Sequence, residues 1–249
     1  MDDFLIFVSV NPSEFRNLIS NLLNNSIFWT QDTAGGKVTV SVETDEQFVR
    51  IHVIDNGTGM TREQVKEIER NQPKSHRQDG SGIGLKNAEY YVKTWNGQLF
   101  IKSEIEKGTS ITIQLPRSPI PEWCVSTIFF RPKSKILVLD DDASIHKIWH
   151  ERLRNDPDFC DINIIQLHDG ALLKETIELN PDIYLFLIDQ EFLHQEQKGI
   201  DLIADLGISK RSILVTSKWN DKNIIERCKS LNIKILPKPM AGHVLLIYR

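Results

Sequence analysis

The residues in this sequence that could perform chemistry form two groups, and the first is rich in glycine and asparagine. Gly80, Gly82 and Gly84 occupy alternate positions directly before a segment with helical spacing. Glycines let a backbone approach a phosphate closely, and the N-terminus of the following helix favours negative charge. Asn21 and Asn25 lie four residues apart, on one face of an expected helix, where an amide oxygen suits Mg²⁺. Each asparagine alone could equally be a polar residue on a solvated helix face.

An aspartate and two glycines in the same half could recognise a nucleotide base. The stretch from Asp55 to Gly59 (Asp-Asn-Gly-Thr-Gly) follows an apolar strand, and a further turn stands at Gly108-Thr109. An aspartate that ends a buried strand can accept a hydrogen bond from an exocyclic amine such as that of adenine. Taken alone, such a stretch is more often a simple turn. Its order and spacing relative to the other boxes favour a nucleotide pocket.

The second group consists of polar side chains that follow predicted strands in the second half. They are Asp140, Asp141, Asp142, Asp189, Thr216, Ser217 and Lys238. In open α/β sheets, ligands bind beyond the carboxyl ends of the strands, so these groups should converge. Clustered carboxylates repel one another unless a cation is present, and their oxygens suit Mg²⁺. A carboxylate beside a metal, a hydroxyl and an ammonium can accept a phosphoryl group. For Asp142 we favour a simpler role, as the N-cap of a helix near Ala143.

The elements that must position these residues differ between the two halves. The first half predicts a helix capped by Asn11 or Ser13, two strands, a loop-rich stretch, a helix and two strands. This order indicates an α+β sandwich. The second half predicts apolar strands at 136–139, 162–167, 183–188, 213–215 and 233–236, separated by helix-length segments. Short apolar strands between helices are typical of a doubly wound five-stranded parallel α/β domain.

Four prolines mark a boundary between the halves. They are Pro116, Pro119, Pro121 and Pro132. Proline removes a backbone donor and disfavours helix in the preceding residue, so we expect a linker at residues 116–134. The domains would then be residues 1–115 and 135–249. Aromatic residues in the linker, including Trp123 and Phe130, could dock it onto one domain.

The composition narrows the classes of function. The 249 residues are 40% hydrophobic and 26% charged, with a net charge of −4, which is typical of globular domains. Neither half has the basic excess of a nucleic-acid binder, so we expect no nucleic-acid partner. The apolar runs are too short to span a bilayer, and we expect no direct membrane contact. Three widely spaced cysteines do not form a disulfide framework.

Taken in order, the glycine and asparagine boxes resemble the catalytic ATP-binding domain of sensor histidine kinases. That domain shares its fold with gyrase, Hsp90 and MutL. The resemblance covers about residues 8–115 and rests on the stretches 21–26, 55–59 and 80–85 and on the turns at Gly97 and Gly108. It implies ATP and Mg²⁺ as ligands. By the same resemblance, Asn25 binds Mg²⁺, Asn21 makes a nearby polar contact and Asp55 reads adenine.

The resemblance also implies roles for the glycines. Gly57 and Gly59 would line the base pocket, and the phosphates would be wrapped by the box that contains Gly80, Gly82, Gly84 and Leu85. Two features depart from the family. Phe28-Trp29 stands where the family has a pair such as Lys-Tyr, and no phenylalanine-rich box is recognisable in residues 67–79. Lys74, and with less support Arg77, could supply the missing phosphate charge; Lys74 could equally be a solvated loop lysine.

The acidic group resembles the receiver domain of response regulators, over about residues 134–249. By this resemblance Asp140 and Asp141 hold the metal together with Asp189, which is the phosphoacceptor. Thr216 contacts the phosphoryl group, Lys238 pairs with it, and the peptide bond from Lys238 to Pro239 is cis. The family's aromatic switch position is Ile235 here, and Leu193 replaces the usual proline after the acceptor. With eleven residues after Lys238, the last helix should be short or missing its end.

A histidine kinase also needs a helical hairpin that carries the phosphorylated histidine. Only the stretch that begins at His150 superficially resembles its motif, and a structural or surface role explains that histidine better. The expected partners are therefore a histidine-bearing dimerisation domain, in an upstream region or on a partner kinase, and a downstream phosphotransfer protein or response regulator. We expect a cytoplasmic location, which includes the cytoplasmic end of a membrane-anchored sensor.

These expectations favour phosphoryl transfer from Mg·ATP to a histidine outside this chain, and then to Asp189. One alternative is a degenerate ATP-domain and receiver scaffold that regulates a partner kinase, which Phe28-Trp29 and Ile235 motivate. Another is an ATPase of the gyrase or Hsp90 kind. Those enzymes place a glutamate four residues before the metal-binding asparagine. The residue here is Asn21, and a carboxamide is no general base.

Overall fold

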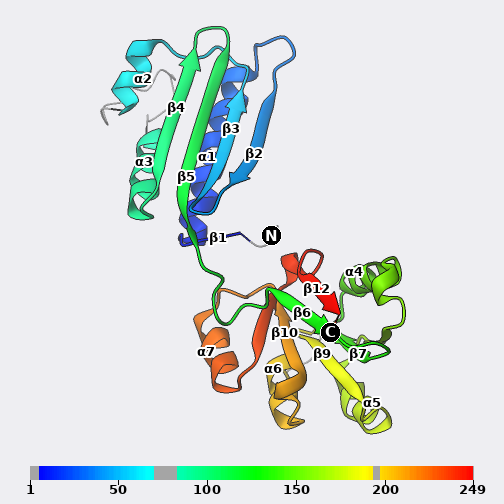
Figure 1. Ribbon diagram of the computed structural model, residues 1–249. Helices are drawn as coiled ribbons and strands as arrows, with labels where there is room; N and C mark the ends of the chain where they lie inside the picture. Colours follow the sequence, from blue (N-terminus) through cyan, green and yellow to red (C-terminus); the bar gives the residue numbers. More distant parts are fainter. Residues whose placement is uncertain (1–5, 70–82, 193–196, 249) are drawn as a thin grey trace. The chain divides into compact units, whose positions relative to one another are not determined.

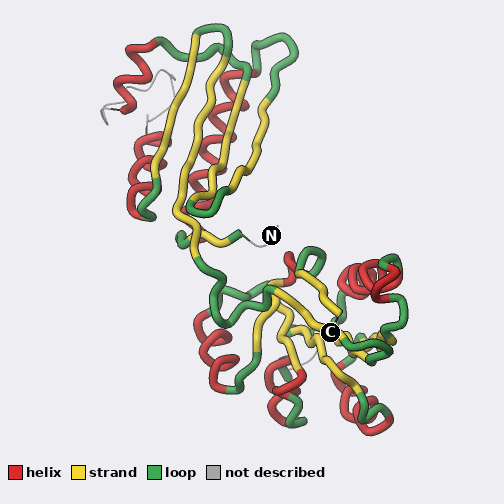
Figure 2. The backbone as a smooth tube through the Cα atoms, in the orientation of Figure 1, coloured by secondary structure: helices red, strands yellow, loops and turns green. Residues whose placement is uncertain are grey.

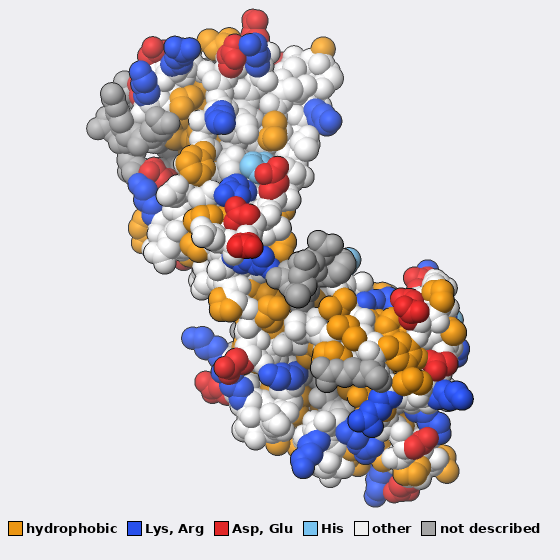
Figure 3. Space-filling view, in the orientation of Figure 1, with side chains coloured by type: hydrophobic (Ala, Val, Ile, Leu, Met, Phe, Trp, Pro, Cys, Tyr) orange, Lys and Arg blue, Asp and Glu red, His pale blue; other side chains and the backbone are white. Residues whose placement is uncertain are grey.

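The computed structural model describes residues 6–69, 83–192 and 197–248, which form two compact units. The first unit is Ile6–Pro119, and the second begins at Ile120. Within the described ranges, no helix has the length and apolar character needed to cross a bilayer. The visible face of each unit carries charged side chains of both signs (Figure 3). Cys124, Cys160 and Cys228 form no disulfides.

The first unit is an antiparallel sheet with helices α1 and α3 on one side (Figures 1 and 2). Its strands are β1 (Phe7–Val8), β2 (Val38–Thr44), β3 (Phe48–Asp55), β4 (Gln98–Glu104) and β5 (Gly108–Ser118). Its helices are α1 (Pro12–Thr30), α2 (Arg62–Glu69) and α3 (Ile83–Thr94). Strand β5 pairs with β3, with β4 and, near its end, with β1, while β2 pairs with β3. The predicted α+β sandwich is confirmed.

The core of this unit follows from the periodicity of its sequence. On β3 every second residue is buried, and Val53 is only 1% exposed. Leu18 and Leu22, one helical turn apart on α1, pack against this face together with Val92 of α3. Asn11 rather than Ser13 caps α1: its side chain accepts hydrogen bonds from the amides of Ser13 and Glu14, at 3.0 and 3.2 Å.

Helix α2 lies in the stretch expected to be rich in loops, and that expectation was wrong for residues 62–69. The helix is preceded by a capping box. The Thr61 hydroxyl accepts from the Gln64 amide at 3.2 Å, and the Gln64 side chain accepts from the Thr61 amide at 2.7 Å. A threonine followed three residues later by glutamine is a sequence signal for a helix start. The helix was therefore predictable from local sequence.

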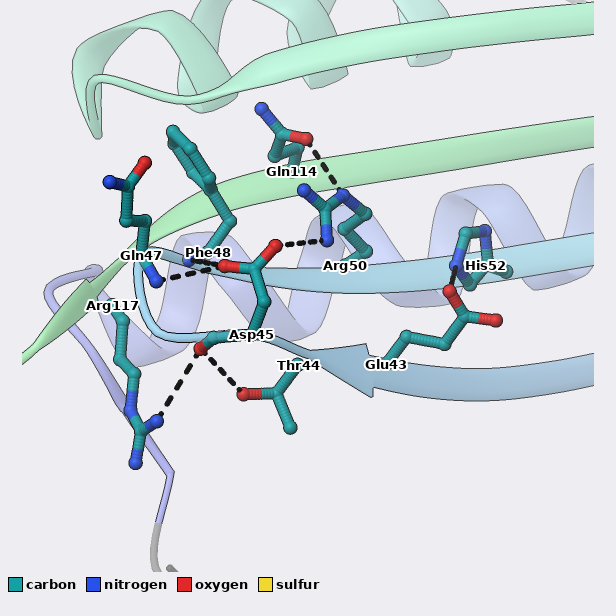
Figure 4. A network of polar contacts seen from close by, with 9 residues as sticks. All are labelled: Glu43, Thr44, Asp45, Gln47, Phe48, Arg50, His52, Gln114 and Arg117. Carbon is teal, nitrogen blue, oxygen red and sulfur yellow. Dashed lines mark hydrogen bonds and ion pairs between the residues drawn. The ribbon is translucent and has the colours of Figure 1, made fainter.

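The turn between β2 and β3 is held by Asp45 (Figure 4). Its Oδ1 atom accepts hydrogen bonds from the amides of Gln47 and Phe48, both at 2.8 Å, and its Oδ2 atom lies 2.7 Å from Arg50. The Gln47 amide, with help from Arg50, lowers the pKa of Asp45 to about 2. Arg50 also donates to Gln114 of β5, so the turn is connected to the neighbouring strand. This network sets the start of β3, whose other end carries Asp55.

The second unit is built around a parallel sheet in the order β11-β10-β9-β7-β8, which confirms the predicted five-stranded doubly wound arrangement. The strands are β6 (Thr127–Phe130), β7 (Lys135–Leu139), β8 (Asn163–Leu167), β9 (Ile183–Asp189), β10 (Ser212–Thr216), β11 (Lys234–Pro237) and β12 (Leu245–Tyr248). The α-helices are α4 (Ala143–Arg154), α5 (Leu173–Leu179), α6 (Gly199–Asp205) and α7 (Lys222–Ser230).

Both faces of this parallel sheet are buried. On β7, Ile136 and Val138 contact one hydrophobic cluster, and Leu137 and Leu139 contact the other. The first cluster includes residues of α4, β6 and β12, and the second includes residues of α5, α6 and α7. Such two-sided burial explains the unbroken apolar run that predicted the strand.

A two-stranded parallel ribbon lies where a last helix was expected. After a short 3₁₀ turn at Lys238–Met240, the chain forms β12, which pairs in parallel with β6. Residues Ile128 and Phe130 of β6 are buried in the cluster that also contains α4. Tyr248 of β12 stacks on Phe159, with ring centroids 5.0 Å apart. The ribbon therefore covers the sheet face that α4 leaves open.

The proline-rich stretch at residues 116–134, expected to be a linker that could dock onto one domain, contains the end of strand β5 and strand β6. Strand β5 continues to Ser118, and the boundary between the units lies after Pro119. After Pro119, the chain forms hydrogen bonds with β11 at the edge of the parallel sheet. The Ile235 amide donates to the Trp123 carbonyl, and the Val125 amide donates to the Ile235 carbonyl, at 2.8 and 2.9 Å. Trp123 also stacks on Trp219. The aromatic residues that were expected to dock thus contact the second unit.

Candidate functional site

In the first unit, the end of β3 and the turn before β5 form one polar site. Asp55 is 7% exposed, and its Oδ1 atom accepts hydrogen bonds from the amides of Gly57 and Thr109, both at 3.1 Å. Thr109 lies 54 residues further along the chain than Asp55. The structure thus joins two turns that the sequence presented separately. Two backbone donors on one oxygen fix the orientation of this carboxylate.

Two glycines of this site are required by close backbone contacts within the protein. Gly59 has a φ of +67°, and a Cβ atom there would lie 1.9 Å from the Glu104 carbonyl oxygen. Gly108 has a φ of +98°, and a Cβ atom there would lie 2.0 Å from the Asp55 carbonyl oxygen. Both positions exclude larger residues whether or not a ligand binds.

The C-terminal end of α1 meets the turn that follows Asp55. The Thr58 amide donates to the Trp29 carbonyl at 3.2 Å. On the same helix Asn25 is half-buried and Asn21 is exposed. Phe28 and Trp29 are each 38% exposed, with their rings edge to face at 5.0 Å. Aromatic rings therefore occupy the position at which the family that this sequence resembles has a lysine.

Part of the expected nucleotide site lies outside the described residues. Lys74, Arg77, Gly80 and Gly82 belong to this part. Gly84 and Leu85 are in the first turn of α3. The described part of the site thus brings Asp55, its turn and the end of α1 together, with Gly84 and Leu85 at a helix start.

In the second unit, acidic groups and a lysine converge at the carboxyl ends of β7, β9 and β11. The Lys238 ammonium lies 2.7 Å from Asp189 Oδ2 and 3.1 Å from Asp140 Oδ1. A cavity of about 250 Å³ opens beside them. It is lined by Asp141, Asp142, Asp189, Glu191, Phe192, Ser217 and Lys238. The strand-end argument from the sequence placed these groups at the same edge of the sheet, and the structure does the same.

Burial controls the electrostatics of this pocket. It raises the pKa of Asp189 to about 6, although the hydrogen bond from Lys238 acts in the opposite direction. Burial also raises the pKa of Asp140. Burial by itself would lower the pKa of Lys238. The hydrogen bond to Asp189 and the negative charge of Asp189 outweigh burial, so the pKa of Lys238 is raised. One ammonium thus stands against two buried carboxyl groups, with Asp141 nearby.

The donor set suits a divalent cation. Carboxylate oxygens of Asp140, Asp141 and Asp189 all lie within 4.8 Å of one another. Asp140 Oδ2 is buried, lies 3.1 Å from the Lys238 ammonium, and accepts no hydrogen bond from the described residues. The same ammonium also contacts Asp140 Oδ1 and Asp189, so one positive charge faces three clustered carboxyl groups, and a further cation would compensate the remaining charge. Hard oxygen ligands of this kind fit Mg²⁺.

The surrounding residues differ in part from the expectations. Thr216 is 1% exposed, and its hydroxyl accepts a hydrogen bond from the Lys218 amide at 2.9 Å, while Ser217 lines the cavity. The expected cis bond before Pro239 was wrong, since no peptide bond in the described ranges is cis. A trans proline suits the first positions of the 3₁₀ turn that begins at Lys238. Asp142 caps α4 as predicted, accepting from the Ser144 amide at 2.8 Å.

Three residues around the pocket were not predicted. Lys218 forms an ion pair with Glu191, which lines the cavity. His146 is 4% exposed and lies 2.7 Å from the carbonyl oxygen of Asp140. The sequence offers one signal for two of these residues, which is their position shortly after a predicted site residue. Glu191 is two positions after Asp189, and His146 is six positions after Asp140.

Comparison with known proteins finds a family match within the first unit. Residues 10–119 match the family model of histidine kinase-, DNA gyrase B- and HSP90-like ATPases. The first unit is therefore similar to the ATP-binding domains of that family. The sensor histidine kinase RppB of Synechocystis is 37% identical over 116 residues, which are 45% of this chain and 25% of RppB.

A second relative extends over both units. The sensor protein TorS of Escherichia coli is 24% identical over 254 residues, covering 98% of this chain and 26% of TorS. The chain thus spans about a quarter of the length of these curated relatives. Among solved structures, a mycobacterial sensor histidine kinase, MprB, has a TM-score of 0.40 and 25% identity, over 46% of this chain and 78% of that chain.

Proposed function

We propose that this chain carries the ATP-binding and phosphoacceptor modules of a two-component sensor kinase. The first unit would bind Mg·ATP and present its γ-phosphoryl group to a histidine on a dimerisation domain outside this sequence. The second unit would be a receiver that takes the phosphoryl group onto Asp189. A downstream phosphotransfer protein or response regulator would receive it next, and the reactions would occur in the cytoplasm.

In the first step, Asp55 would accept a hydrogen bond from the adenine amine, and Asn25 would contribute its amide oxygen to the Mg²⁺ that accompanies ATP. An imidazole nitrogen of the acceptor histidine attacks the γ-phosphorus. The bond from that phosphorus to the β–γ bridging oxygen breaks, and ADP leaves. Imidazole is nucleophilic without a general base, so the carboxamide of Asn21 is compatible with transfer. Activation of water would need a base there, which disfavours an ATPase.

In the second step, a carboxylate oxygen of Asp189 attacks the phosphorus of the phosphohistidine. The P–N bond breaks as the P–O bond forms, and the imidazole leaves after it gains a proton from solvent. The Lys238 ammonium, 2.7 Å from Asp189, would compensate the negative charge of the transferred group. Mg²⁺ held by Asp140, Asp141 and Asp189 would supply further positive charge for the phosphoryl oxygens. Thr216 would have to turn its hydroxyl away from the Lys218 amide to contact them.

One observation carries the proposal: the buried carboxyls of Asp140 and Asp189 share the Lys238 ammonium, and Asp189 and Lys238 line a cavity. A purely structural ion pair would not need a third carboxylate within 4.8 Å. This geometry suits a site that binds a cation and then an anionic phosphoryl group. The similarity of the first unit to sensor kinases supplies a source of that group.

The relay can be tested with γ-labelled ATP and a separate dimerisation-domain protein that carries the acceptor histidine. The wild-type chain should label the histidine protein and then itself. Asp189→Asn should still label the histidine protein but not itself. Asp205→Asn, on an exposed part of α6, is the matched control and should behave as wild type. Label on neither protein would contradict the proposal.

The exposed Phe28-Trp29 pair supports a second candidate, a scaffold that no longer binds ATP. Without a lysine at this position, one phosphate contact is missing. Calorimetry with Mg·ATP separates the two candidates, because a scaffold would give no heat of binding. Restoring the charge with Phe28→Lys should then increase affinity only if the pocket still accepts the nucleotide.

A further inference from the structure

His146 occupies a buried position directly behind the acidic pocket. It lies on the first turns of α4 and is 4% exposed, with its Nε2 atom 2.7 Å from the main-chain oxygen of Asp140. A carbonyl oxygen only accepts, so Nε2 carries the hydrogen and donates it. The tautomer is thereby set, and Nδ1 becomes an acceptor.

The histidine itself is poorly satisfied by this arrangement. Its Nδ1 atom is buried and has no hydrogen-bond partner among the residues that the structure describes. The exposed ring of His168 packs against it, with centroids 4.2 Å apart, but forms no hydrogen bond that would help. An unpaired buried acceptor is destabilising, and a leucine would fill the same space without that cost. The position is better explained by what the histidine does for Asp140.

Asp140 is held through every polar group but one. Its amide donates to the Leu167 carbonyl at 3.1 Å, and its carbonyl accepts from His146. Its Oδ1 atom accepts from the Asp142 amide at 2.9 Å and from Lys238 at 3.1 Å. The remaining group, Oδ2, lies 3.1 Å from the Lys238 ammonium but accepts no hydrogen bond from the described residues. The surrounding bonds therefore present one oxygen in a fixed direction.

We propose that His146 is a positioning residue for a divalent cation: by holding the Asp140 peptide, it aims Asp140 Oδ2 at the cation. This role rests on the proposed phosphoacceptor site. Residues that hydrogen-bond to metal ligands typically change metal affinity by about 10- to 100-fold when they are replaced. The effect should act on the binding of Mg²⁺ and should follow the hydrogen bond rather than the bulk of the side chain.

Calorimetric titration of the full chain with Mg²⁺ alone tests this role. Asp140→Asn should abolish the heat signal of Mg²⁺ binding. His146→Leu keeps the bulk of the side chain but removes the hydrogen-bond donor, and should weaken Mg²⁺ affinity by about 10-fold or more. His146→Gln can place an amide donor near the Nε2 position and should restore affinity to within about threefold of wild type. His168→Leu, which removes the neighbouring ring but not the hydrogen bond, should bind as wild type.

Nitrogen-15 NMR of the wild-type imidazole gives a readout that does not depend on the variants folding. It should show His146 with its hydrogen on Nε2, and the opposite tautomer would overturn the role. Wild-type affinity in His146→Leu, or equal losses in the leucine and glutamine variants, would also overturn it while leaving the phosphoacceptor site intact. Absence of Mg²⁺ binding by the wild-type chain would instead refute the site itself, and this role with it.

Discussion

Asp55 and Asp189 both end a strand at a buried position, 7% and 3% exposed, yet their surroundings differ in kind. Asp55 is held by two backbone amides, which are neutral donors that the fold supplies at fixed positions. Asp189 faces a lysine and two other carboxyl groups, and its pKa is raised to about 6. A carboxylate oriented by neutral donors suits the recognition of a ligand through hydrogen bonds. A carboxylate among buried charges suits binding of a cation and acceptance of a phosphoryl group.

Glycines allow close backbone packing at both sites. A Cβ atom would lie 1.9 Å from the Glu104 carbonyl oxygen at Gly59, 2.0 Å from the Asp55 carbonyl oxygen at Gly108 and 1.8 Å from the Asp189 carbonyl oxygen at Gly199. The sites differ in what surrounds the carboxylate. Backbone amides orient Asp55, whereas charged side chains from the ends of three parallel strands converge on Asp189. The following experiments test that distinction.

The largest effect should come from removing the proposed acceptor. Asp189→Asn should abolish phosphorylation of the chain by a small-molecule phosphodonor such as phosphoramidate, because an amide is not a nucleophile for this reaction. Intact-mass spectrometry detects the added phosphoryl group. Asp55→Asn, in the other unit, should be phosphorylated like wild type. Phosphorylation of Asp189→Asn at an unchanged level would remove the basis of the comparison.

A backbone substitution should be next in size. Gly108→Ala should destabilise the first unit by about 3 kcal/mol, because the new methyl group would collide with the Asp55 carbonyl and φ is +98°. Gly35→Ala is the matched control: φ is +69° there, but nothing lies within 4 Å of the new Cβ. It should cost only about 1 kcal/mol. Hydrogen exchange of β3 and β5 localises the loss. Equal costs would contradict the role given to close packing.

Nucleotide affinity should depend on Asp55 to a smaller extent. Asp55→Asn should weaken binding of a non-hydrolysable ATP analogue by about 10- to 100-fold, since one charge-assisted hydrogen bond is lost. Asp45→Asn changes an exposed aspartate at the opposite end of β3 and should leave affinity unchanged. Calorimetry provides the measurement. Unchanged affinity in Asp55→Asn would remove this residue from the proposed pocket.

The smallest effect should be a dependence of stability on pH in the second unit. The pKa of Asp189 is about 6 in the fold, above its ordinary value of 3.8, so the folded state retains the proton to higher pH than the unfolded state. The resulting stabilisation is complete below the unfolded pKa and is lost as pH rises through about 6. Without divalent cations, wild type should therefore lose stability relative to Asp189→Asn between pH 4 and 7.

Urea unfolding at several pH values, followed by a probe in the parallel sheet, measures this difference. Added Mg²⁺ should reverse the trend, because a cation favours the ionised carboxylate. A wild-type curve parallel to that of Asp189→Asn over the whole range would show that burial does not control this group.

Much of the fold was predictable because its signals are local. Asn11 followed by Pro12 marks the start of α1, and the four-residue apolar run of β7 indicates a strand that is buried on both faces. The capping box at Thr61 and Gln64 carries the same kind of local signal for α2. The convergence of Asp140, Asp189 and Lys238 was also predictable, because the rule for strand ends in parallel sheets applies whatever the loops do.

Other features depend on contacts between distant segments. The pairing of β12 with β6 replaces an expected helix, and it forms because Ile128 and Phe130 already occupy the sheet face beside α4. Similarly, Trp123 joins the sheet edge at Ile235 even though nearby prolines indicate a linker. Short apolar segments are ambiguous between strand and helix until a partner is available, so local sequence could not decide them.

The sequence by itself determined which residues could do chemistry, and that they belong to one glycine-rich and one acidic group. Residue type and order carry this information, since hydrogen bonding and charge belong to each side chain. Only the tertiary structure decided how those groups are held. It placed the Thr109 amide on Asp55 and the imidazole of His146 against the main-chain oxygen of Asp140, and it brought the Lys238 ammonium to both Asp140 and Asp189. Burial and the direction of a lone pair depend on every neighbour at once, and only the folded chain defines those neighbours.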